Sequence, residues 1–457
     1  MKRSKKLCIL LGILIAVCLA ALAAMLSEEK KEEIKTSGET VLSIEPAKVT
    51  ALCWEQDGTT WSFHRGDDGW QYDDDAEFPV SDSAMDALLE PFRSLSAAFT
   101  IENAEDLGRY GLDEPTCTIT LTTDDKTYTV KLGDHSTMDS QRYMDIGDGN
   151  VYLAASDPLD AYDVELKDLI ANDDVPYFDE VSQIRFAGSE DYSVIYDENG
   201  KSICADDIYF TVDGKPLDTS RVNSYISVLR YLELTDYVTY RITDEELSAY
   251  GLDDPELSVS VDYTGDGTSD TFVLHISRDP AEKKSTADAE DEDTSDITAY
   301  ARVGDSKIIY QISGSSYQSL MAAGYNDLRH QEIFSGNFDD VTGIDVTLDG
   351  ETYTLTAQKD GKERTWLCEE AEIEIGDLQD ALEALTAEEF TSEKATGQQE
   401  ISLTLHLDHE DEPELTITLY RCDGSKCLAV VDGKSVAYVP RGEMVTLAEA
   451  IRVFALN

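Results

Sequence analysis

Positive charge is scarce in this sequence. The 457 residues include 94 Asp and Glu but only 36 Lys and Arg, which gives a formal net charge of −58 at pH 7. Nucleic acids and anionic lipid surfaces are therefore repelled rather than attracted. The acids are spread along the whole chain, as expected for a solvated exterior. We therefore expect no nucleic-acid partner.

Residues typical of catalytic and metal sites are also few. The chain has six His, and its eight Cys form no paired CxxC units, so a zinc-finger site is not supported. No GxSxG, HExxH, Walker or GxGxxG pattern is present. Carboxylate pairs are numerous simply because acids are numerous, and none stands out as an acid–base couple. We expect no catalytic residue, no metal and no cofactor.

Two cysteines lie close together in the sequence. Cys422 and Cys427 flank an Asp-Gly turn, which could place them across a hairpin. A disulfide between them is possible outside the cell. Two separate, half-buried thiols near a turn fit equally well, so both interpretations stay open.

One long apolar run occurs, at the N-terminus. The uncharged segment from Leu7 to Ser27 is long enough to span a bilayer, and the basic residues 1–6 before it favour a cytoplasmic N-terminus. The run exceeds the apolar core of a signal peptide, which is about 7–15 residues long. It predicts an uncleaved signal-anchor with the bulk of the chain outside the cell membrane. Residues 28–48 read as a polar stalk.

Two nearly identical hexapeptides organise the rest of the chain. Tyr110-Gly111-Leu112-Asp113-Glu114-Pro115 is repeated 140 residues later as Tyr250-Gly251-Leu252-Asp253-Asp254-Pro255. Each glycine fits the left-handed position after a helix, each leucine can fold back on the last turn, and each proline bars continuation. The hexapeptides are therefore predicted to be structural corners between a short helix and a strand. A binding loop carrying Asp113 and Asp253 is the alternative.

The surrounding pattern predicts a tandem α+β repeat. Each copy contains opening strands, a helix, a short extended link and an antiparallel meander of four strands. The copies span residues 49–172, 178–335 and 340–457, and the third lacks the hexapeptide. An acidic insertion in the second copy, residues 279–297, is predicted to be disordered.

Three weaker candidate sites have simpler interpretations. Asp262 to Asp270 superficially resembles a calcium loop but lacks the terminal glutamate. His406 to Glu410 contains ligand-type residues but reads as an exposed hairpin loop, which is a poor metal cage. Trp54, Trp61, Trp70 and Tyr72 could line a sugar-binding face, yet they alternate with polar residues, which favours core packing.

The two hexapeptides, their meanders and the single N-terminal membrane helix resemble a bacterial family, the "domain of unknown function forty-three-forty" family. The resemblance covers roughly residues 49–334 and is weaker from 341 to 457. Members of that family are often encoded beside gliding-motility-type ABC transporter components. The resemblance thus implies a transporter accessory role, with an ABC permease or other envelope proteins as partners, and it carries over no catalytic residue.

Three functions remain open from the sequence. We expect a membrane-anchored, extracytoplasmic, non-enzymatic binding or accessory subunit, since repeats supply extended binding surface. One alternative is a binding protein for wall polysaccharide, peptide or divalent cation. The other is a hydrolase.

Overall fold

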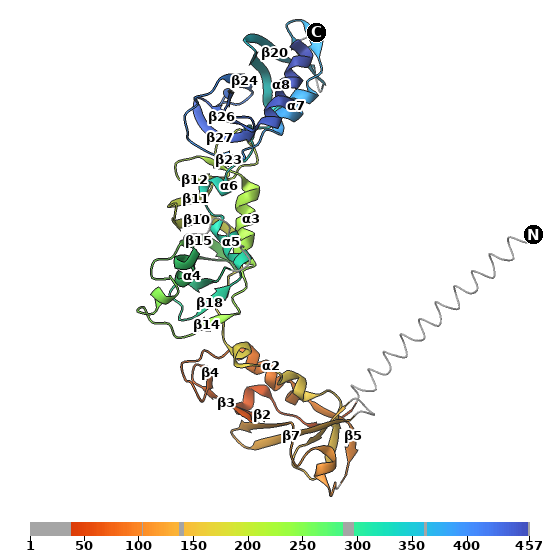
Figure 1. Cartoon of the computed structure of the whole chain (residues 1–457). Helices are drawn as coiled ribbons and strands as arrows, with labels where there is room; N and C mark the ends of the chain where they lie inside the picture. The colour runs from red at the N-terminus through yellow and green to blue at the C-terminus, as the bar shows by residue number, and fades with distance from the viewer. Residues whose placement is uncertain (1–37, 103, 137–140, 287–296, 361–362, 456–457) are drawn as a thin grey trace, which may run out of the picture. The chain divides into compact units, whose positions relative to one another are not determined.

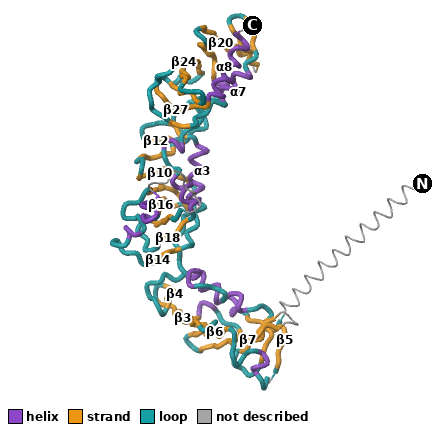
Figure 2. Tube along the Cα trace, viewed as in Figure 1, coloured by secondary structure: helices purple, strands orange, loops and turns teal. Residues whose placement is uncertain are grey.

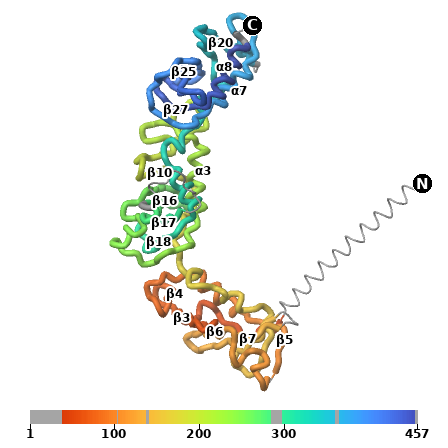
Figure 3. The backbone as a smooth tube through the Cα atoms, in the orientation of Figure 1, coloured from red at the N-terminus to blue at the C-terminus, as the bar shows by residue number. Residues whose placement is uncertain are grey.

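A computed structural model describes residues 38–102, 104–136, 141–286, 297–360 and 363–455 (Figure 1). Its contacts divide the chain into two units, Met1–Asp173 with Thr235–Arg241, and Asp174–Leu234 with Ile242–Asn457. Antiparallel strands dominate, and the few helices are short (Figure 2). Three nine-stranded sheets follow one another along the sequence, each built from one continuous stretch of colour in Figure 3.

The first sheet belongs to repeat one and has the order β1-β5-β9-β8-β7-β6-β2-β3-β4. Its strands are β1 (Glu39–Leu42), β2 (Val49–Gln56), β3 (Thr59–Gly66), β4 (Gly69–Tyr72), β5 (Leu95–Ile101), β6 (Cys117–Thr123), β7 (Thr127–Ser136), β8 (Gln141–Asp145) and β9 (Val151–Ala154). Its helices are η1 (Pro46–Lys48), α2 (Asp82–Arg93), η2 (Leu107–Tyr110), η3 (Pro158–Ala161) and η4 (Leu166–Leu169).

The second sheet has the order β13-β12-β11-β10-β15-β16-β17-β18-β14. Its strands are β10 (Glu180–Gly188), β11 (Tyr192–Tyr196), β12 (Tyr209–Thr211), β13 (Pro216–Leu217), β14 (Tyr237–Thr239), β15 (Leu257–Gly265), β16 (Thr268–Arg278), β17 (Ala299–Val303) and β18 (Ile309–Ile312). The helices are α3 (Thr219–Arg230), η5 (Leu247–Ala249), α4 (Pro280–Thr286), α5 (Gly314–Met321) and α6 (Tyr325–Leu328).

The third sheet has the order β22-β21-β20-β19-β24-β25-β26-β27-β23. Its strands are β19 (Val341–Leu348), β20 (Glu351–Asp360), β21 (Glu363–Cys368), β22 (Ala371–Ile373), β23 (Glu389–Phe390), β24 (Gln399–Leu407), β25 (Glu414–Arg421), β26 (Lys426–Val431) and β27 (Lys434–Pro440). The helices are η7 (Phe338–Asp340), α7 (Gly376–Glu383) and α8 (Arg441–Ala455).

One topology underlies all three sheets. In each, the first opening strand (β2, β10 or β19) pairs with the first meander strand (β6, β15 or β24), and the link strand (β5, β14 or β23) adjoins the last meander strand. The first of these pairings carries a bulge near its start in every repeat, between Val49 and Ala51, between Val181 and Gln183, and between Val341 and Gly343. Bulges are designed features rather than defects. The shared bulge therefore marks repeat three as a copy of the same unit although its hexapeptide is missing.

Alternation of apolar and polar residues explains why the sheets bury one face. In repeat one, Trp54 lies opposite Ile119 and Leu52 lies opposite Leu121, and all four are buried. In repeat three, Val346 opposite Leu403 and Ile344 opposite Leu405 repeat the pattern. Helices supply the other side of this core; Leu382 of α7 and Leu447 of α8 are both 0 % exposed.

The structure corrects two segment boundaries. Part of the predicted stalk, residues 28–48, belongs to repeat one, because β1 pairs with β5 and Ile44 is buried. Part of the insertion predicted to be disordered, residues 279–297, forms the helix α4. Asp279 accepts a hydrogen bond from the Ala281 N–H, and Glu282 accepts one from the Thr298 N–H, so local capping bonds order this stretch.

Helix α2 runs through Pro91 to Arg93. The end of repeat two holds two short helices, α5 and α6. Among the described residues, no helix is long and apolar enough to cross a membrane. The predicted anchor, Leu7 to Ser27, lies outside the described residues.

Candidate functional site

The hexapeptides form helix-terminating corners. Gly111 has φ 67° and ψ 22°, in the left-handed region, and the Leu112 N–H donates to the carbonyl of Leu107 over 3.1 Å. Gly251 has φ 69°, and the Leu252 N–H donates to the carbonyl of Leu247 over 3.0 Å. This is the bond pattern of a Schellman stop, which satisfies carbonyls at a helix end.

The side chains of the two corners make equivalent contacts. Leu112 and Leu252 are buried, at 0 % and 5 % exposure. Tyr110 packs on Tyr143 of β8, and Tyr250 packs on Tyr300 of β17, with ring centroids 4.9 and 5.0 Å apart.

The remaining corner residues face solvent or cover the core. Asp113 accepts a hydrogen bond from the N–H of its neighbour Glu114. Asp113 and Asp253 are exposed, and Pro115 and Pro255 are half-buried just before β6 and β15. The tyrosine, glycine and leucine of each corner thus have a local backbone or packing role.

The weaker candidates are held by neighbouring side chains. Asp262, in the stretch resembling a calcium loop, forms an ion pair with Arg185 over 2.5 Å and accepts from Thr271. Nε2 of His406 lies 2.9 Å from Asp345, and Nδ1 of His409 accepts from the Glu412 N–H. Trp54, Trp70 and Tyr72 are buried, and Trp54 stacks on Phe63 at 5.5 Å, so these aromatics build the core.

The possible disulfide between Cys422 and Cys427 is not formed. Cys427 lies opposite Arg421 in the β25–β26 ladder, and Cys422 is the next residue along, so the two side chains point to opposite faces. Cys422 is exposed and Cys427 is buried as a free thiol. Burial raises the pKa of Cys427 to about 11.

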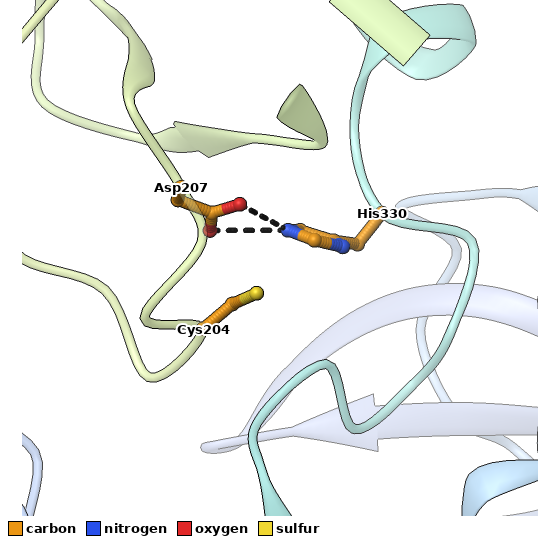
Figure 4. A group of neighbouring side chains, drawn as sticks. All are labelled: Cys204, Asp207 and His330. Carbon is orange, nitrogen blue, oxygen red and sulfur yellow. Dashed lines mark hydrogen bonds and ion pairs between the residues drawn. The ribbon is translucent and has the colours of Figure 1, made fainter. Parts of the chain in front are cut away.

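One cluster of polar side chains in repeat two was not anticipated. It consists of Cys204 and Asp207, from the loop between β11 and β12, and His330, from the segment after α6 (Figure 4). The Sγ atom, a carboxylate oxygen and a ring nitrogen all lie within 4.8 Å of one another. Nε2 of His330 is 2.9 and 3.1 Å from the two Asp207 oxygens. The thiol points toward the space beside this pair (Figure 4).

Short-range hydrogen bonds fix the loop that carries two members of the cluster. The Asp207 N–H donates to the Cys204 carbonyl over 3.2 Å, which closes a turn. The hydroxyl of Ser202 donates to Asp207 over 2.7 Å and accepts from the Cys204 N–H over 3.2 Å. The Asp207 side chain is only 1 % exposed. Cys204 and Asp207 are therefore preorganised before His330 is added.

His330 lies where repeat two leads into repeat three. Its neighbours bond to the third repeat: the Ala387 N–H donates to the Gln331 carbonyl, and the Ile333 N–H donates to the Leu385 carbonyl. Ile203, next to Cys204, packs on the core of the third repeat. The cluster thus fastens a loop of repeat two to the segment that carries the chain into repeat three.

The electrostatics of the cluster argue against a nucleophilic cysteine. Burial raises the pKa of the Cys204 thiol, and the charges of Asp207 and Asp206 raise it further. Burial by itself would lower the pKa of His330, but the hydrogen bond and charge of Asp207, with Asp218 and Glu332, outweigh it and raise the pKa. Reactive cysteines have a depressed thiol pKa, because the thiolate is the nucleophile. The raised pKa of Cys204 does not meet this condition.

Sequence reasoning missed this cluster because its members are far apart in the chain. Cys204 and His330 are brought together only by the path of the second sheet, and Cys-x-x-Asp has no established meaning as a motif. The one available signal was that a rare His stands near the end of the predicted second copy, residues 178–335.

A second feature, in repeat three, is an open cavity of about 490 Å³. Its lining includes Arg421, Arg441, Arg452, Glu400 and Asp349. Arg421 pairs with Glu400, Arg441 lies 3.5 Å from the same carboxylate, and Arg452 lies 2.9 Å from Asp349. Three arginines in one cavity are notable where acids outnumber bases more than twofold.

The register explains why this cavity belongs to repeat three. Cys117, Leu257 and Ile401 are equivalent, since each pairs with the last residue of the first opening strand. The residues just before Cys117 and Leu257 are the hexapeptide corners. Gln398 and Gln399, which line the cavity, stand in their place. Repeat three therefore has this cavity at the position where repeats one and two have the hexapeptide corner.

Glu256 of repeat two is equivalent to Glu400 and is fully engaged. It accepts from the Arg278 N–H and the Tyr317 hydroxyl, each over 2.8 Å, and forms an ion pair with Lys283. Burial by itself would raise its pKa, but the bonds from Lys283, Arg278 and Tyr317 lower it below the usual value of 4.5.

This pKa predicts an acid-dependent contribution to stability. Because the folded pKa of Glu256 is depressed, its contribution is present above about pH 4.5 and is lost as the pH falls through the folded pKa. Glu256→Gln should lower the free energy of unfolding by about 2 kcal/mol at neutral pH, and the difference from wild type should shrink in acid. Urea titrations across pH 3–7 measure it. Glu90→Gln, at an exposed pair with Arg93, is the control and should show no such trend. A difference independent of pH would contradict this assignment.

Comparison with known proteins identifies a family. The family model described as "Domain of unknown function (DUF4340)" matches residues 70–255 and 210–404. The first match begins in β4 and the second in β12, and each extends into the following repeat. No curated protein and no solved structure matched the chain.

Proposed function

Because this chain belongs to the family of the domain of unknown function DUF4340, repeated twice along it, we propose its function from its own residues. It is a non-enzymatic binding subunit, held at the outer face of the cell membrane by residues 7–27, that serves an envelope complex of the ABC-transporter type. The resemblance to proteins encoded beside gliding-motility-type transporters supports the choice of partner.

The observation that carries a binding function is the cavity in repeat three. Arg441 and Arg421 share the carboxylate of Glu400, so their combined positive charge is only partly neutralised. Guanidinium groups bind carboxylates and phosphates in a bidentate manner. We infer that the cavity accepts an acidic group of the partner, which exchanges with Glu400 or Asp349 as the counter-ion of an arginine.

The described residues favour binding over catalysis. The cluster of Cys204, Asp207 and His330 holds a thiol of raised pKa, and the arginine-lined cavity contains carboxylates already paired with cations. A hydrolase needs a nucleophile or an activated water beside a free base. In the ligand-binding alternative, the same arginines bind an anionic wall polymer instead of a protein.

Purification of the intact protein from its membranes tests the partner. Recovery of an ABC permease or ATPase subunit in mild detergent is expected, and the yield should fall at least about fivefold with the double variant Arg441→Ala, Arg452→Ala, since charge-assisted contacts contribute about 1.5–3 kcal/mol each. Arg93→Ala, which removes an exposed arginine of repeat one, is the matched control. Recovery of no transporter subunit would reject the transporter role. Retention of wall polymer that depends on the same two arginines would favour the alternative.

A further inference from the structure

We propose that Cys204, Asp207 and His330 form a binding site for a divalent transition-metal ion of the zinc type, which clamps repeat two to the segment leading into repeat three. The three side chains offer a sulfur, an oxygen and a nitrogen ligand within 4.8 Å of one another. Thiolate, imidazole and carboxylate are the ligands that zinc takes in proteins, whereas calcium and magnesium prefer oxygen ligands. The donor set therefore selects the class of metal.

The distances suit three of the four positions around one tetrahedral ion, after small side-chain rotations. Zinc bonds to sulfur, nitrogen and oxygen are about 2.0–2.3 Å long, so two ligands of one ion lie roughly 3–4 Å apart. Nε2 of His330 and the Asp207 oxygens are already 2.9 and 3.1 Å apart, and Sγ of Cys204 faces them (Figure 4). On binding, the ion replaces the hydrogen bond between His330 and Asp207. Sγ gives up its proton to solvent, and so does Nε2.

The surroundings of His330 support the same assignment. Metal-ligating histidines usually direct their other ring nitrogen to a carboxylate, which orients the ring. Nδ1 of His330 lies 3.8 Å from a Glu332 oxygen, and Asp218 belongs to the same group of neighbours. On the other side, Ser202 fixes both Asp207 and the backbone of Cys204. The cluster thus has three ligands and two further carboxylates, Asp218 and Glu332, near the His330 ring.

The position of the cluster gives the ion a structural consequence. His330 stands between Gln331 and Ile333, whose backbones bond to the third repeat, while Cys204 and Asp207 belong to repeat two. An ion coordinated by all three would tie these segments by coordinate bonds. Binding to the folded state alone stabilises it by mass action.

Cobalt binding to the intact, detergent-solubilised chain tests the site. After treatment with a chelator, the protein should take up one Co²⁺ and show thiolate-to-cobalt charge-transfer absorption that zinc displaces. Cys204→Ser should abolish this absorption. Two matched controls should retain it: Cys368→Ser, at another half-buried free thiol, and His406→Asn, at a His–Asp pair without a neighbouring cysteine. Absorption that is missing from the wild type, or that survives in Cys204→Ser, would overturn the proposal.

A second measurement uses the wild-type chain and so does not depend on a variant that folds. Mass spectrometry after thiol alkylation gives a rate for each cysteine with and without zinc. Zinc should slow alkylation of Cys204 at least about tenfold and leave that of Cys368 and Cys422 unchanged. Glu332→Gln should weaken zinc binding by about 10–100-fold if this carboxylate orients His330. Equal rates at Cys204 with and without zinc would count against a site there.

Discussion

Gly111→Val is expected to destabilise repeat one by about 4 kcal/mol or more. A β-branched residue at φ 67° is strained by about 1–3 kcal/mol. A Cβ at this position would also lie 2.6 Å from the Asp134 carboxylate and 2.8 Å from the Asp134 backbone nitrogen, and the backbone atom cannot move aside without disturbing β7. Strain and overlap together exceed the cost of most single substitutions.

Tryptophan fluorescence during urea unfolding measures this effect selectively, since three of the four tryptophans, Trp54, Trp61 and Trp70, lie in repeat one. Gly147→Val is the matched control, because Gly147 also has a positive φ, 81°, but an added Cβ would meet no atom within 4 Å. The free energy of unfolding of Gly147→Val should fall only by the cost of the backbone strain. Equal losses in the two variants would contradict the packing role of the hexapeptide. A stable Gly111→Val protein that loses partner binding would instead restore the binding-loop interpretation.

Asp207→Ala is expected to lower the stability of the unit containing repeats two and three by about 2–3 kcal/mol with a chelator present. The substitution removes the buried partner of His330 and of the Ser202 hydroxyl, so two polar groups are left without their acceptor. Removing one member of a buried pair costs more than the pair itself contributes, because the other member stays desolvated.

Hydrogen exchange measured by mass spectrometry localises the loss. Peptides covering residues 197–208 and 328–334 should exchange faster, since these segments meet at the cluster. Asp345→Ala is the control: it breaks another His–Asp contact, with His406, but both side chains there are more than a third exposed. That variant should lose less than about 1 kcal/mol. Similar losses in the two variants would show that the Asp207–His330 pair has no special role in joining the repeats.

The sequence predicted the antiparallel α+β repeats because each strand, turn and helix stop has a short-range cause. Gly111 and Gly251 adopt the left-handed backbone conformation that ends each short helix, and Leu112 and Leu252 fold back over the preceding turn. Each corner needs only residues that are neighbours in the sequence. Alternating apolar residues in the opening strands predict one buried face without knowledge of the partner strand. These features suffice to locate the copies and their corners. The predicted N-terminal anchor, which lies outside the described residues, rests on the same kind of reasoning, from one uncharged apolar run.

What only the tertiary structure decided is which distant strands pair and which side chains therefore meet. In each repeat the first opening strand pairs with the first meander strand: β2 with β6, β10 with β15 and β19 with β24. This pairing joins the opening hairpins and the meander into one sheet. No local sequence pattern specifies it. The tertiary structure also brings Cys204 and Asp207 to His330, 126 residues further along the chain from Cys204. Short-range propensity acts over a few residues, whereas a site of convergent side chains depends on contacts between segments more than a hundred residues apart. The sequence therefore determined the repeated unit. The tertiary structure determined which polar side chains come together on it.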